Sequence, residues 1–108
     1  MITVHHLKDY AERQVDFLFK ECPDKMDLYF RHGHRYEVVA VVDVADYQPD
    51  EAFRLTNNID KNWAENGKVF PTPSVMERGG CRNTSVGDVL VLSNGRRLLL
   101  SSYGWKRF

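Results

Sequence analysis

The sequence predicts a single α+β domain, with an about four-stranded, mainly antiparallel sheet, an N-terminal helix and one or two short helices packed on one face. The chain has 108 residues, of which 43% are hydrophobic, enough for one modest core within one domain covering residues 1–108. An amphipathic segment near the start predicts the first helix, and two pairs of β-rich segments predict two hairpins. A small curled half-barrel is the alternative arrangement.

Residues 7–22 are expected to form the N-terminal helix. Apolar residues recur there at three-to-four spacing: Leu7, Ala11, Val15, Leu18 and Cys22. Charged side chains fall mainly on the other side, and Pro23 is expected to end the helix because proline has no amide proton.

The first hairpin is predicted over Met26–Arg31 and His34–Val44. Both segments are rich in β-branched and aromatic residues, and His32-Gly33 between them is typical of a tight turn. The second strand contains an apolar run on both of its faces, which indicates a central strand.

A second helix is expected to begin at Pro49, where two acidic residues follow a proline suited to the first helical turn. Asn66-Gly67 is a helix stop signal. Residues 68–85 show no periodicity and are expected to form a long connection. The second hairpin joins Asp88–Ser93 to Arg96–Tyr103 through Asn94-Gly95, the dipeptide typical of type I′ turns.

Charge is balanced overall but unevenly distributed. Residues 1–51 hold 11 acidic and 6 basic residues, whereas residues 52–108 hold 4 acidic and 9 basic residues. This arrangement weakens a simple nucleic-acid-binding interpretation without removing a local basic patch. The chain starts without a secretory signal pattern and lacks a long apolar run, so we expect a cytoplasmic protein without a membrane partner. Cys22 and Cys81 are expected to be free thiols.

No motif predicts a catalytic, metal or cofactor site. His5-His6 is expected near a flexible terminus, and His32 and His34 at a solvated hairpin tip. Cys81 is the strongest nucleophile candidate, with His32 or His34 as a distant base, but a small half-buried cysteine explains it better. We therefore expect no enzyme, no metal and no cofactor.

Two segments remain as candidate contact surfaces. Residues 79–88 place polar and charged side chains between Gly79-Gly80 and a strand, which predicts either a capped turn or an exposed anion-binding loop. The C-terminal residues Tyr103, Trp105 and Phe108 alternate with Lys106 and Arg107. Such a tail can close a core edge, bind a protein or stack on single-stranded nucleic acid.

Part of the second half resembles known small proteins. Ala52–Asp60, Trp63, Arg82–Val89 and Tyr103-Gly104-Trp105 resemble segments of uncharacterised proteins of phages and mobile elements. Ser85-Val86-Gly87-Asp88-Val89 is similar to the Ser-Val-x-Asp-Val core of the YodL-like family. The resemblance implies an accessory protein that contacts host macromolecules in the host cytoplasm, and it implies no catalytic residues.

The sequence therefore predicts a non-enzymatic interaction module that binds a host protein. The alternative is a nucleic-acid-binding protein that uses the C-terminal basic and aromatic residues. The expected partner-binding residues combine the helix after Pro49, the polar loop and the tail: Arg54, Asn57, Trp63, Arg82, Asn83, Thr84 and Trp105.

Overall fold

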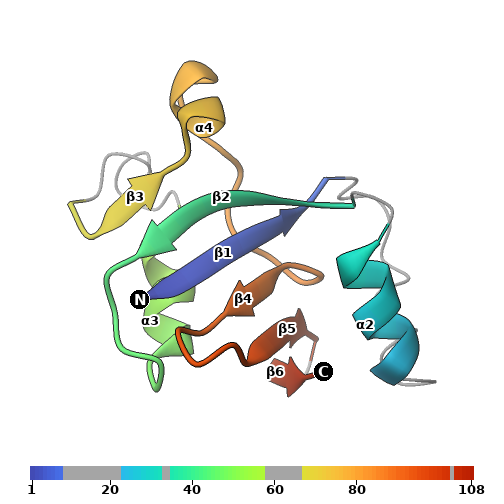
Figure 1. Ribbon diagram of the computed structural model, residues 1–108. Coiled ribbons are helices and arrows are strands. Elements are labelled where there is room, and N and C mark those ends of the chain that lie inside the picture. Colours follow the sequence, from blue (N-terminus) through green and yellow to red (C-terminus); the bar gives the residue numbers. More distant parts are fainter. Residues whose placement is uncertain (9–22, 33–34, 58–66, 103) are drawn as a thin grey trace.

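A computed structural model describes residues 1–8, 23–32, 35–57, 67–102 and 104–108 (Figure 1). Within these residues, six strands form one sheet in the order β3-β2-β1-β4-β5-β6, and all neighbouring strands are antiparallel. The strands are β1 (Ile2–Leu7), β2 (Tyr36–Val42), β3 (Val69–Pro71), β4 (Val89–Val91), β5 (Arg97–Ser101) and β6 (Gly104–Arg107). The helices are α2 (Pro23–Arg31), α3 (Pro49–Leu55) and α4 (Pro73–Glu77). The α+β class is confirmed, with a larger sheet than predicted.

The first element is the central strand β1, so the prediction that the chain begins with a helix is wrong. Ile2 and Val4 alternate with Thr3 and His5, the period of two typical of a strand. β1 pairs with β2 on one side and β4 on the other. The predicted flexible terminus at His5-His6 therefore lies in the sheet, while most of the predicted helix, residues 9–22, lies outside the described residues.

Helix α2 replaces the strand predicted over Met26–Arg31. Pro23 begins this helix, which agrees with the preference of proline for the first helical turn. The buried side chains of Met26 and Tyr29 are three residues apart, and Arg31 pairs with Asp27 one turn before it at 2.8 Å. The aromatic content suggested a strand, whereas the buried side chains of this segment follow the spacing of a helix and pack against β4 and β5.

Strand β2 confirms the predicted strand over residues 34–44 in its central part. Its neighbours are β1 and β3, so the hairpin predicted with residues 26–31 is wrong. The register between β1 and β2 shifts between Val4 and His5, and Val39 and Ala40 are consecutive buried residues. The bulge explains why these two neighbouring residues are both buried.

Residues 68–85, predicted as one long connection, contain β3 and α4. Val69 and Val75 are buried and tie both elements to the core. The side chain of Thr72 accepts a hydrogen bond from the backbone N–H of Val75, and Pro73 follows it in the first turn of α4. Three- and five-residue elements are too short for a periodicity to be seen.

Two local predictions are confirmed. Helix α3 begins at Pro49, although residues 58–66 of its expected extension lie outside the described residues. Strands β4 and β5 form the predicted hairpin, and Gly95 has a φ of +87° in its turn. Strand β6 then adds to β5 as the last strand of the sheet.

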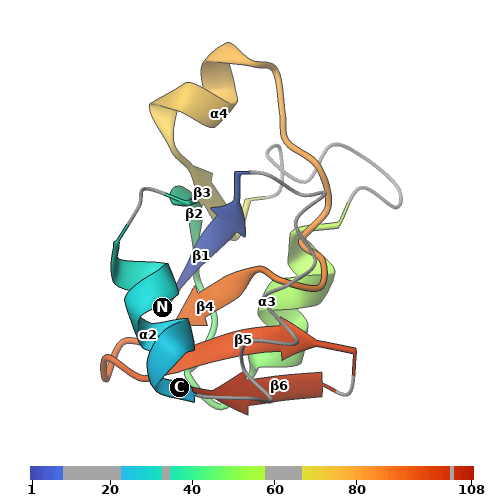
Figure 2. The same ribbon diagram turned by 90° about the vertical axis from the view of Figure 1, so that its right-hand side faces the viewer.

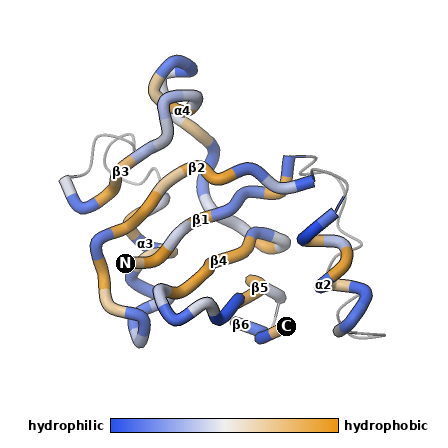
Figure 3. Tube along the Cα trace, viewed as in Figure 1, coloured by the Kyte–Doolittle hydropathy of each residue, from blue (hydrophilic) through white to orange (hydrophobic). Residues whose placement is uncertain are grey.

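The core has two layers, one on each face of the sheet. Helix α3 packs through Ala52 and Leu55 on one face, and α2 packs through Met26 and Tyr29 on the other (Figure 2). The prediction that the helices pack on one face of the sheet is therefore wrong for α2 and α3. Apolar residues concentrate along the central strands between these layers (Figure 3).

The longest helix among the described residues is α2, with nine residues. None of the helices in those ranges has the length and apolar character needed to cross a bilayer.

Candidate functional site

The polar segment singled out in the sequence, residues 79–88, lies between α4 and the start of β4. It is anchored at three points by backbone hydrogen bonds: Gly80 N–H to Val75 O, Thr84 N–H to Thr56 O at the end of α3, and Gly87 N–H to Leu100 O on β5. These bonds measure 3.1, 3.0 and 2.8 Å. These bonds fix the segment against α4, against the end of α3 and against strand β5 of the sheet.

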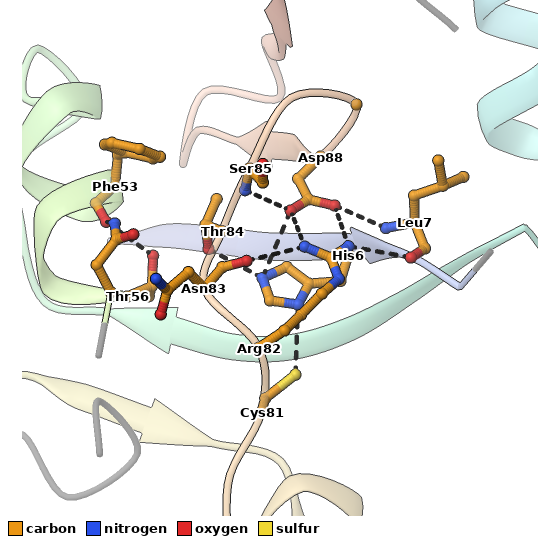
Figure 4. Close-up of polar contacts among 12 residues, drawn as sticks. His6, Leu7, Phe53, Thr56, Cys81, Arg82, Asn83, Thr84, Ser85 and Asp88 are labelled. Atoms are coloured by element: carbon orange, nitrogen blue, oxygen red, sulfur yellow. Dashed lines mark hydrogen bonds and ion pairs between the residues drawn. The ribbon is translucent and has the colours of Figure 1, made fainter. Parts of the chain in front are cut away.

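Asp88 is the centre of this anchoring (Figure 4). Its fully buried carboxylate accepts two bonds of 2.6 Å from the Arg82 guanidinium, one to each oxygen. The carboxylate also accepts the backbone N–H groups of Leu7 and Ser85 at 2.9 and 2.8 Å. Arg82 further donates to the carbonyl oxygens of Leu7 and Asn83. A bidentate pair of this kind joins the loop to the end of β1.

The loop amides are therefore committed to the chain itself. The N–H groups of Thr84, Ser85, Gly87 and Asp88 all donate to atoms of this protein. The capped-turn interpretation accounts for Ser85 and Asp88, and these four amides do not form an anion-binding nest.

His6 lies beside this ion pair and was not anticipated as part of any site. Its imidazole is 2% exposed, with Nε2 2.9 Å from Thr84 Oγ1 and 3.8 Å from Asp88 Oδ2. Its other nitrogen, Nδ1, lies 3.4 Å from Sγ of Cys81 (Figure 4). A cysteine, a histidine and an orienting hydroxyl therefore stand in a row, the arrangement that a cysteine nucleophile needs.

The electrostatics of this row do not provide an activated thiol. Burial lowers the pKa of His6 to about 4, which keeps the imidazole neutral at pH 7. Burial also raises the pKa of the Cys81 thiol, although the guanidinium of Arg78, 3.9 Å from Sγ, acts in the opposite direction. Nucleophilic cysteines require a thiolate, so a neutral thiol and imidazole are better explained as packed polar neighbours.

The imidazole that lies near Cys81 among the described residues is that of His6, which was not one of the two expected bases. His32 is at the end of α2, which packs on the opposite face of the sheet, and residue 34 lies outside the described residues. Among the described residues, no group of three or more metal-ligating side chains comes together.

No protein-family model, curated protein or solved structure matches this chain.

The expected partner-binding residues fall into two groups. Arg54 and Asn83 are exposed and Asn57 is half-buried; the bond from Thr84 N–H to Thr56 O holds their two segments side by side. We name Arg54, Asn57 and Asn83 the α3–loop rim. Within it, Arg54 donates to Glu51 and Asn57 donates to the carbonyl oxygen of Phe53, so both side chains are oriented by their own helix.

The other expected residues are used inside the protein or lie outside the description. Thr84 is buried and Arg82 is bound to Asp88, while Trp63 lies outside the described residues. Trp105 is half-buried: its indole N–H donates to Asp50 at 2.8 Å, and its ring meets Phe53 edge-on. The tryptophan thus closes the core edge over α3.

Trp105 and Phe108, the C-terminal aromatic residues that the structure describes, do not form one platform. Phe108 packs against Phe30, and the guanidinium of Arg97 lies 4.6 Å from its ring centroid. Trp105 packs toward α3 instead, on the other face of the sheet. With both rings engaged internally, the stacking surface required by the nucleic-acid alternative is reduced.

Proposed function

We propose that this chain is a non-enzymatic interaction module, and that it binds a protein of a host cell through the α3–loop rim in the host cytoplasm. The observation that carries the proposal is the backbone bond of 3.0 Å from Thr84 to Thr56, which holds the loop against the end of α3. The buried pair of Asp88 and Arg82 supports it, because a loop fixed before binding loses less conformational entropy when a partner binds.

The chemistry of the rim suits recognition of a protein surface. Arg54 is 63% exposed, and Arg is one of the residues enriched at sites that dominate protein-binding energy. Asn57 and Asn83 supply amide groups that both donate and accept hydrogen bonds. The charge of Arg54 is partly balanced by Glu51, so the rim offers hydrogen bonds more than a net positive field.

The raised pKa of the Cys81 thiol speaks against a cysteine nucleophile, which is the strongest enzyme candidate in the sequence. A cysteine enzyme would lower the pKa of its thiol, whereas burial raises it at this position.

The proposal is tested with the tagged full chain as bait in host lysate, with the captured proteins quantified by mass spectrometry. The rim variant carries Arg54→Ala and Asn83→Ala, and the matched control carries Arg107→Ala at an exposed arginine of β6, so that each variant loses one positive charge. We expect a protein that the wild type and the control capture equally and that the rim variant loses. Circular dichroism checks that all three chains are folded.

Two results would contradict the proposal. If the rim variant captures every protein that the wild type captures, the rim is not the contact surface. If the wild type captures no specific protein at any salt concentration, and instead binds a single-stranded oligonucleotide with an affinity that falls steeply with salt, the nucleic-acid alternative replaces it.

A further inference from the structure

A second surface lies on α2, on the face of the sheet opposite to the α3–loop rim (Figure 2). It is an open hollow of about 330 Å³ between α2 and the start of β2. Its described lining residues come from both elements and from the end of the helix: Lys25, Leu28, Tyr29, His32 and Arg35. No part of the network around Asp88 contributes to it.

The hollow carries positive charge that the described protein does not neutralise. Five arginines of the described chain are paired with carboxylates: Arg31, Arg54, Arg78, Arg82 and Arg97. In contrast, Lys25 and Arg35 form no ion pair within the described ranges. Lys8 is exposed and donates its backbone N–H to the carbonyl oxygen of Arg35, which brings a third cationic residue to the same edge.

The floor of the hollow is apolar and is shaped by two residues of α2. Leu28 is 52% exposed, so it offers an apolar side chain to the solvent beside the buried Tyr29. Tyr29 is buried to 7% exposure, and the Arg35 guanidinium lies 4.2 Å from its ring centroid. Because this cation covers one face of the ring and the protein buries the rest, Tyr29 is not a platform for stacking a nucleic-acid base.

We propose that this hollow binds an acidic segment of a partner protein, with an aliphatic side chain resting on Leu28 and Asp or Glu side chains facing Lys25 and Arg35. Charge complementarity selects an anionic partner. The exposed leucine selects a peptide over inorganic phosphate, and the covered tyrosine selects a peptide over single-stranded nucleic acid. The proposal goes beyond the α3–loop rim, since the two surfaces share no residue, and either can fail alone.

The test uses the ¹⁵N-labelled full chain and three short synthetic peptides. The first places two leucines between pairs of glutamates, the second replaces the glutamates with glutamines, and the third replaces the leucines with glycines. We expect the first peptide to shift the backbone amide signals of Lys25, Leu28 and Arg35, and the second and third to bind at least about threefold more weakly. Raising the salt concentration is expected to weaken the first peptide.

Two variants with the same change in net charge locate the interaction. Lys25→Glu is expected to weaken the first peptide about tenfold, because a surface attraction is replaced by a repulsion. Arg96→Glu, at the exposed turn between β4 and β5, is expected to change the affinity less than about twofold. Leu28→Ser is expected to weaken binding about threefold and to leave the free energy of unfolding nearly unchanged, since the side chain is half exposed.

Four results would overturn the proposal. The glutamine peptide binding as tightly as the glutamate peptide would remove the role of charge. Equal losses from Lys25→Glu and Arg96→Glu would mean that the peptide responds to net charge and not to the hollow. A single-stranded oligonucleotide that shifts the same amide signals at lower concentration would make the site a nucleic-acid site. If the first peptide shifts none of these amide signals at concentrations up to about 2 mM, the hollow does not bind it with a useful affinity.

Discussion

Replacing Asp88 by Asn removes the charge at the centre of the loop network while keeping the shape of the side chain. In the wild type, one carboxylate oxygen accepts the N–H of Leu7 and one arm of Arg82, and the other accepts the N–H of Ser85 and the second arm of Arg82. Asn has one carbonyl oxygen, so its amide group must face one backbone N–H and one guanidinium N–H, whichever way it is turned.

The expected cost follows from these lost bonds. A buried backbone donor without an acceptor costs about 1–3 kcal/mol, and breaking a fully buried ion pair costs about 3–5 kcal/mol. Arg82 is 28% exposed, so water can solvate part of its charge and the ion-pair loss falls below that range. We therefore expect Asp88→Asn to lower the free energy of unfolding by roughly 3 kcal/mol, a large share of the stability of a small domain.

The measurement is urea-induced unfolding followed by far-UV circular dichroism, with the wild type and Asp88→Asn compared at pH 7. The matched control is Asp46→Asn, whose carboxylate accepts the N–H and the hydroxyl of Ser93 at an exposed turn, where water can replace them. A loss below about 1 kcal/mol for Asp88→Asn, or a loss no greater than that of Asp46→Asn, would refute the argument that Asp88 anchors the loop.

Three further outcomes are expected. The pKa of His6 is about 4 in the folded state and 6.5 in the unfolded state, so the unfolded chain takes up the proton first as pH falls. Up to about 3 kcal/mol of the free energy of unfolding is therefore lost between pH 6.5 and 4. Urea unfolding at several pH values should show that the free energy of unfolding depends less on pH in His6→Gln than in the wild type, and an equal dependence would contradict this. Gly87 has a φ of +98° and is buried against Leu7, so Gly87→Ala should cost about 1–3 kcal/mol by thermal unfolding. Gly79→Ala should cost less, because its φ of +76° is closer to the left-handed helical value and the space around it is open. In a Cys22→Ser background, iodoacetamide should label Cys81 more slowly than it labels free cysteine at pH 7.5, and faster labelling would support a cysteine enzyme.

Local signals in the sequence predicted some elements well. The turn between β4 and β5 forms at Asn94-Gly95. It could be predicted because the preference of this dipeptide for a turn depends only on its local backbone geometry. Pro49 and the acids after it were sufficient to place the start of α3. By contrast, the short segment Met26–Arg31 has both aromatic content and helical spacing, and packing of Met26 and Tyr29 against β4 and β5 decided for helix.

The candidate site could be predicted only in part. The polar run Arg82–Asp88 was visible, and Asn83 is exposed as the interaction hypothesis requires. The inward turn of Arg82 and Thr84 was not visible, because their hydrogen-bond partners include residues of β1 and Asp88. His6 had one available signal, the alternation Ile2, Val4, His6, which places its side chain on the buried face of a strand.

The sequence by itself determined the α+β class, the Asn-Gly hairpin, the start of α3 and the unequal distribution of charge, since each depends on composition or on neighbouring residues. Only the tertiary structure decided that β1 lies between β2 and β4, that α2 and α3 cover opposite faces, and that His6 meets Thr84 across 78 positions of the chain. The physical reason is that such contacts form when the whole core closes: their free energy comes from shared burial of distant segments, and no short window of sequence encodes it.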